Sequence, residues 1–136
     1  TLAAGAISSG FGAIDIGSST LTAGSATVAG TNISGSTASS IQSETRVVAT
    51  VAVASYSSAQ FDYSVNDGTN YRAGTVVAVW KPLTGNAGIQ FTDFSTPDVG
   101  DTSDATFLMD CTAANARLKL AAAAGTWTVK IATRAL

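Results

Sequence analysis

The sequence predicts an all-β protein: an antiparallel β-sandwich of jelly-roll-like type, preceded by an extended stalk or arm rich in Gly, Ser and Thr. From residue 44 onward, apolar side chains recur at every second position in most segments, and clusters of turn-forming residues separate those segments. Residues 1–43 instead hold seven glycines and one charged residue, Asp15. We therefore divide the chain into a low-complexity β-stalk or arm at 1–43 and a β-sandwich head domain at 44–136.

The N-terminal segment repeats a short unit that closes on glycine, at positions 17, 24, 30 and 35. One chain cannot bury the few aliphatic side chains of these units against itself, which predicts that several copies share them along a common axis. A flexible linker and an extended arm that lies on a partner remain alternatives. The candidate oligomer-interface residues are Ile14, Ile16, Leu21, Val28 and Ile33.

The head domain reads as a series of short strands with turns between them. The Asp67-Gly68 pair favours a positive φ and predicts that the strands on either side of it form a hairpin. In the first strand, we expect one face to hold Val47, Ala49, Val51 and Val53. The predicted strands span 45–53, 59–65, 71–80, 89–94, 105–111 and 126–131.

One segment, residues 113–124, fits two structures. Its alanines have high helix propensity, and Gly125 suits the end of a helix. The order Ala116-Arg117-Leu118-Lys119-Leu120 nevertheless alternates, with the two basic residues on the wet face. We predict a strand here and keep the helix as the alternative.

The alternation also predicts which side chains form the core. We interpret Cys111 as a buried, inert thiol. Trp80 is expected in the core as well, although its place beside the loop at 81–88 leaves a sugar-stacking platform as an alternative. The predicted core residues are Val47, Val51, Phe61, Val76, Ala78, Phe107, Leu118, Leu120, Trp127 and Val129.

The composition argues against most enzymatic and nucleic-acid functions. The chain has no histidine, which removes the usual general base and the commonest metal ligand. Its net charge of −2 gives no basic field for nucleic acid. No apolar run approaches the length of a membrane span. We therefore expect no catalysis, no cofactor, no metal site, no nucleic-acid partner and no membrane insertion.

The loop at 95–104 is the most acidic part of the head. It carries Asp98, Asp101 and Asp104, and their spacing does not match a calcium-binding loop. We interpret the loop as solvated, and its three aspartates as candidate surface-binding residues, because binding residues concentrate on loops.

Several stretches resemble proteins of tailed-bacteriophage virions. Residues 10–24 resemble the low-complexity stalk segments of such proteins. Residues 67–74 and 113–120 look like two signature stretches of the C-terminal β-domain of fibre-like virion proteins, and the ending 127–136 is also similar. The resemblance implies a virion surface protein of fibre or spike type that is generally a trimer, and it brings no catalytic residues.

From the residues and the resemblance together we expect a structural protein of a phage virion. The leading hypothesis is a trimeric fibre- or spike-type element on the virion surface, made in the host cytoplasm, that serves particle assembly and host attachment. Its partners would be itself, other capsid or tail proteins, and a host surface glycan or receptor. A capsid decoration (cement) protein that stabilises the head is the main alternative, and a carbohydrate-binding module is a third.

Overall fold

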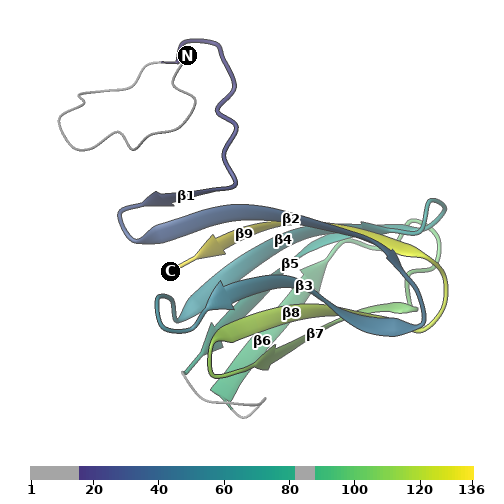
Figure 1. Cartoon of the computed structure of the whole chain (residues 1–136). Helices are drawn as coiled ribbons and strands as arrows, with labels where there is room; N and C mark the ends of the chain where they lie inside the picture. The colour runs from purple at the N-terminus through teal and green to yellow at the C-terminus, as the bar shows by residue number, and fades with distance from the viewer. Residues whose placement is uncertain (1–15, 82–87) are drawn as a thin grey trace.

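The computed structural model describes residues 16–81 and 88–136 (Figure 1). In that part of the chain nine strands form two antiparallel sheets. The larger sheet has the order β1-β2-β9-β4-β5-β6 and the smaller one β3-β8-β7. The strands are β1 (Ser25–Val28), β2 (Thr31–Ile41), β3 (Glu44–Ala52), β4 (Ser58–Asn66), β5 (Tyr71–Trp80), β6 (Ile89–Ser95), β7 (Ala105–Cys111), β8 (Asn115–Ala122) and β9 (Trp127–Ala135).

The two sheets pack face to face as a β-sandwich, which confirms the predicted fold class (Figure 1). β2 pairs with β9, and β3 pairs with β8, so the two ends of the described chain run as nested antiparallel pairs. This pairing of early with late strands is typical of a jelly roll. The middle of the chain departs from that pattern, because β4, β5 and β6 follow one another as hairpins within the larger sheet.

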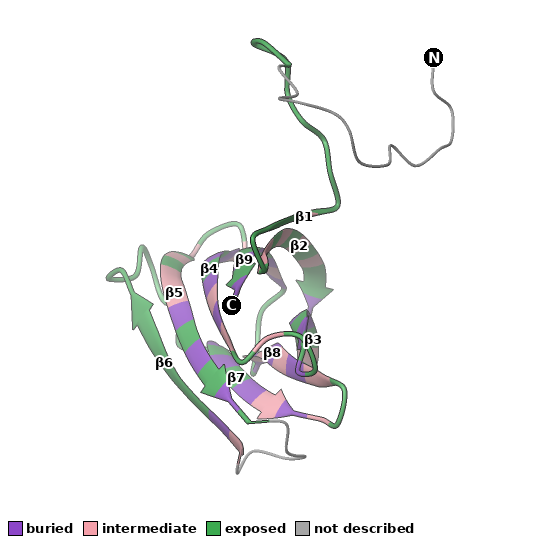
Figure 2. Ribbon diagram, turned by 90° about the vertical axis from the view of Figure 1, so that its left-hand side faces the viewer, coloured by how far each residue is buried: buried purple, intermediate pink, exposed green. Residues whose placement is uncertain are grey.

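A single apolar cluster fills the space between the sheets. Buried and exposed residues alternate along most strands, as Figure 2 shows for β5. Nine of the ten predicted core residues are buried, with Phe61, Leu118 and Val129 fully enclosed. The predicted hairpin is also present: β4 pairs with β5, and Gly68 in the turn has a φ of 92°.

The tenth core prediction, Val47, is wrong because β3 contains a bulge. The pairing register of β3 with β8 shifts between Val47 and Ala49, so that Val48 is an extra residue. Val47 lies opposite Lys119 on the outer face and is exposed, while Val48 and Ala49 are both buried. The Val48 carbonyl accepts a hydrogen bond from the Ser36 hydroxyl (2.8 Å), which compensates for the interrupted ladder.

Part of the segment expected as a stalk belongs to the sandwich. β2 pairs with β9 along most of its length, β1 pairs with β2, and Ile41 is fully buried. Arg46 of β3 donates to the Ser39 carbonyl (2.8 Å) and fastens the corner where the chain passes from one sheet to the other. The boundary placed at residue 43 therefore falls inside the sandwich, which begins near Ser25.

Residues 115–122 form strand β8, in agreement with the strand prediction and not with its helical alternative. β8 is the central strand of the small sheet and pairs with β3 and β7. Ala116, Leu118 and Leu120 point into the core, and Gly125 forms the following turn with a φ of 77°. Two-sided pairing thus overrides the helix propensity of the alanines.

Tyr63 connects both sheets to the edge strand β6. Its ring packs on Phe107 of β7 with the ring centroids 4.2 Å apart. Its hydroxyl donates to Asp93 of β6 (2.9 Å). Gly74 of β5 lies directly opposite Tyr63, and a Cβ added there would lie 2.7 Å from Tyr63 Oη and closer still to the Phe94 carbonyl oxygen. The Tyr63 side chain therefore requires glycine at position 74.

We predict that Gly74→Ala lowers the free energy of unfolding by about 1 to 3 kcal/mol, because the new methyl group displaces the Tyr63 ring and the β6 backbone. Gly35→Ala is the matched control in the same sheet, since the nearest atom to its added Cβ is 3.7 Å away. We expect the control to change the unfolding free energy by less than about 0.5 kcal/mol. Urea unfolding of both variants measures the difference, and equal values would contradict the packing argument.

Candidate functional site

The candidate interface residues of the N-terminal segment are exposed wherever they are described. Figure 1 shows the segment before β1 running away from both sheets. Leu21 is 71 % exposed and Val28 is 62 % exposed, and Ile16 and Ile33 are also exposed. Ile14 lies outside the described residues. The structure thus presents an aliphatic arm to the surroundings, which is the property expected of an interface.

Val28 and Ile33 are on the sandwich itself and not on a separate stalk. Ile33 of β2 pairs with Arg134 of β9, whose side chain points outward, so Ile33 is on the outer face of the larger sheet. Ala26 pairs with Ile33, which puts Val28, two residues further along β1, on the same face. The arm outside the sheet therefore ends near Gly24.

A second group of exposed apolar side chains, which the sequence reasoning missed, lies on the same outer face. Val77 and Val79 of β5 and Phe94 of β6 are all exposed. They share one face because Val77 pairs with Thr92, Val79 with Gln90, and Thr75 with Phe94. The signal in the sequence is the unbroken apolar run from Val76 to Trp80, which is apolar on both faces of the strand.

The acidic loop is fixed by its own side chains. Asp98 accepts hydrogen bonds from the hydroxyl (2.6 Å) and the backbone N–H (3.1 Å) of Thr102. Arg72 donates to the same hydroxyl (3.1 Å) and to the Ala105 carbonyl (2.7 Å). The hydrogen bond from Thr102 lowers the pKa of Asp98 despite the opposing cost of desolvation. Asp98 thus serves to hold the loop.

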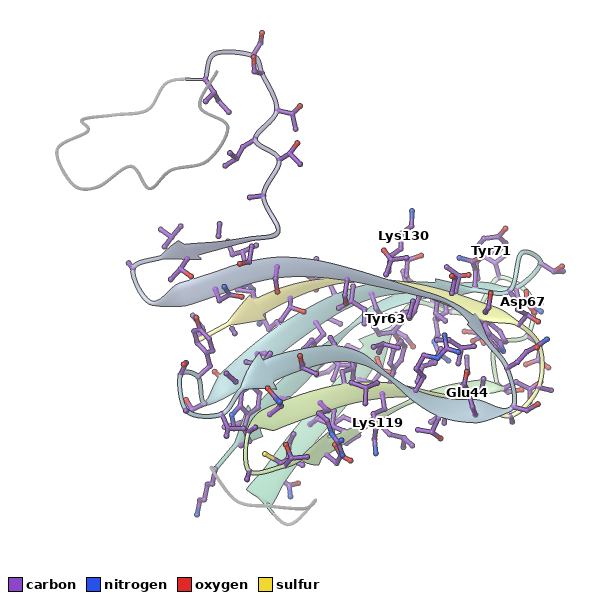
Figure 3. The ribbon with its side chains drawn as sticks, viewed as in Figure 1. Glu44, Tyr63, Asp67, Tyr71, Lys119 and Lys130 are labelled. Carbon is purple, nitrogen blue, oxygen red and sulfur yellow. The ribbon has the colours of Figure 1, made fainter. Side chains whose placement is uncertain are left out.

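Asp101 and the preceding hairpin turn interlock. The Asp101 N–H donates to Asn70 Oδ1 (2.9 Å), and Asp101 accepts from the Ser103 N–H (3.0 Å). Figure 3 shows Asp67 and Tyr71 at this end of the sandwich. Asp67 accepts from the N–H groups of Thr69 and Asn70, which lowers its pKa. These hydrogen bonds join the two loops into one polar surface.

Asp104 differs from Asp98 and Asp101 because the hydrogen bond described for it involves its backbone and not its carboxylate. It is exposed, and its backbone carbonyl accepts from the Ala123 N–H (2.8 Å). The three aspartates are thus in one loop as predicted, all of them exposed, but two of them also fasten that loop. A change at Asp104 alters the charge of the loop without removing those hydrogen bonds.

Trp80 does not provide a sugar-stacking platform. It is 4 % exposed, and its indole N–H donates to the Tyr56 carbonyl (2.8 Å). The alternative kept for it is therefore wrong. Cys111 is buried as predicted, and desolvation raises the pKa of its thiol. Among the described residues, no three His, Cys, Asp or Glu side chains are grouped so that they could hold a metal ion.

The outer face of the small sheet carries an ion-pair cluster. Asp110 accepts two hydrogen bonds from Arg117, from Nε and Nη2 (both 2.6 Å), and a third from Lys119 (2.8 Å). Figure 3 places Lys119 on the small sheet and Lys130 on the opposite outer face. The hydrogen bond from Arg117 lowers the pKa of Asp110, which therefore stays ionised and holds β7 to β8.

We predict that acid removes a part of the stability that depends on Asp110. Its folded-state pKa lies below the unfolded-state value of about 3.9, so its contribution is present above that value and is lost as the pH falls through the folded-state pKa. Asp110→Asn should lower the free energy of unfolding at neutral pH by about 1 kcal/mol. It should also flatten the fall of the melting temperature between about pH 5 and pH 2.

Thermal unfolding across this pH range, followed by circular dichroism, measures both effects. Arg117→Gln serves as the control. In the Asp110→Asn background, it should cause little further loss of unfolding free energy, because its partner carboxylate is already gone. A wild-type protein and an Asp110→Asn variant with parallel pH profiles would contradict the role of the cluster.

No protein-family model matches the chain, and no curated protein or solved structure matches it either. In the described residues, no helix is long and apolar enough to cross a membrane. What can be inferred about function therefore rests on the surfaces described above: an exposed aliphatic arm, an apolar outer face on the larger sheet, and an acidic loop.

Proposed function

We propose that the protein is a structural, non-enzymatic subunit of the surface of a tailed-bacteriophage virion, and that it assembles as a homotrimer through its N-terminal segment. The observation that carries the proposal is the exposure of Leu21, Val28 and Ile33 in a stretch without charged side chains. Clustered exposed aliphatic residues on a folded protein mark interaction sites. The virion part of the proposal rests on the resemblance of the stalk and head segments to virion proteins.

Two versions of this function differ in the task of the arm. In a fibre- or spike-type element, the arm builds a shared stalk and the head presents its loops to the host. In a capsid decoration protein, the arm lies over neighbouring subunits and fastens them. The sandwich already includes β1 and β2, so the described part of the arm is residues 16–24.

We predict that the full chain is a trimer in solution and that Leu21→Asp shifts it towards monomer, because a charge at a buried apolar contact is costly. Thr22→Asp puts the same charge on the adjacent, also exposed residue and should leave the trimer largely intact. Multi-angle light scattering across a concentration series distinguishes the two variants. A wild-type chain that stays monomeric at high concentration would refute assembly through this segment.

The acidic loop separates the two versions. If the head binds a host receptor, Asp104→Lys should reduce adsorption of phage particles to cells at least tenfold and leave particle assembly unchanged. If the protein is a decoration subunit, Asp104→Lys should leave adsorption unchanged. Leu21→Asp should then release the protein from capsids. Adsorption assays and the protein content of purified particles measure the two outcomes. Particles that are fully stable and infectious without the protein would count against both versions.

A further inference from the structure

The outer face of the larger sheet contains a shallow apolar groove at its β5–β6 end. Val77 and Val79 line it together with Ser58, Gln90 and Thr92, and its volume is about 320 Å³. Phe94 lies beyond it on the same face and is 62 % exposed, and Val79 is 55 % exposed. None of these six side chains carries a charge. The groove is therefore suited to an apolar, uncharged segment.

Two features of its position indicate that something covers this groove. The solvent-facing side of an antiparallel sheet normally carries polar side chains, and contiguous apolar patches mark binding sites. The groove also borders β6, which is exposed over almost its full length (Figure 2). In the described part of the chain, β6 pairs only with β5 and forms the free edge of the sheet.

We infer that this groove receives the N-terminal arm of a second copy of the chain, with Leu21 among the valines. The arm has the matching chemistry, because residues 16–43 contain no charged side chain and Leu21 is the most exposed of the large apolar residues described. The inference deepens the proposed function and rests on it. It specifies the surface that the arm contacts.

In the structure, the arm does not lie in the groove of its own chain, because the segment before β1 runs away from both sheets (Figure 1). β1 and β5 are separated by four strand spacings, which amounts to about 19 Å. Leu21 precedes Ser25, the first residue of β1, by four residues, which span at most about 14 Å. We therefore assign the occupant to another copy.

This docking is head to tail. The arm leaves the sheet at its β1 edge and the groove lies at its β6 edge, so each copy donates at one edge and accepts at the other. Such an interface closes into a ring when the rotation between copies fits, and a ring of three leaves no arm and no groove unused. The groove thus gives the proposed trimer a defined contact.

Disulfide trapping between two variants, each with one introduced cysteine, tests the contact. Leu21→Cys and Val79→Cys chains, which carry different tags, are refolded as a mixture and oxidised, so that a disulfide joining the tags is necessarily between copies. Leu108→Cys replaces Val79→Cys in the control, because Leu108 is also exposed, at 39 %, but lies on the outer face of the small sheet. The native Cys111 is buried in the folded chain, so the oxidant is added only after refolding is complete.

We expect at least tenfold more mixed disulfide with Val79→Cys than with Leu108→Cys. We also expect Val79→Lys to reduce the trimer fraction at least tenfold, and Val47→Lys, on the small sheet, to leave it unchanged. Equal trapping in a chain that light scattering shows to be trimeric would overturn the groove as the contact and leave the proposed function standing. A monomeric wild-type chain would overturn both.

Discussion

The Tyr63 side chain is the contact on which the arrangement of the sandwich depends. Its ring packs on Phe107 of the opposite sheet, passes over Gly74, and its hydroxyl holds Asp93 on the edge strand. Burial, together with the hydrogen bond to Asp93, raises the pKa of Tyr63 to about 12, so the hydroxyl stays a neutral donor at physiological pH. β6 is also held by its ladder to β5 and by the buried Ile89, and Tyr63 ties it in addition to the opposite sheet. Tyr63 therefore holds in place the strand that carries Phe94 and borders the valine groove.

The charged side chains are distributed so that the larger sheet keeps an apolar outer margin. Asp110, Arg117 and Lys119 form their cluster on the small sheet, and Asp98 and Arg72 fasten the loops at one end of the sandwich. The acidic loop is held from within by Thr102, which is fully buried. Charge thus contributes to the shape of the loops and to the pairing of β7 with β8, and the free apolar surface remains at the two edges of the larger sheet.

The sequence was informative where one face of a strand is buried by apolar residues, and less so elsewhere. β4, β7 and β9 alternate cleanly, so their core residues could be predicted. β2 was assigned to the stalk because its inward positions hold Ser34 and Ser36, which give no apolar period. The only sign of the β3 bulge in the sequence is the pair of adjacent valines, Val47 and Val48. The alternation predicts the core but not the groove, because the run from Val76 to Trp80 puts apolar side chains on both faces of β5, and Val77 and Val79 lie on the outer face.

The aliphatic residues of the N-terminal segment fall into two classes: those on a strand of the sheet and those that precede the sheet. In a continuous stalk, both classes would have the same role. Val28 and Ile33 are fixed on the outer face of the sheet, whereas Leu21 precedes the sheet and has no strand to hold it. In the proposed assembly, an interface that uses both classes would have a rigid half and an adjustable half, and the arm would order on the neighbouring copy after the sandwich has folded. The cost of ordering the arm, about 1 to 2 kcal/mol per residue, is then met only in the assembled state. In that proposal, substitutions in the arm would change the strength of assembly without changing the fold of the head.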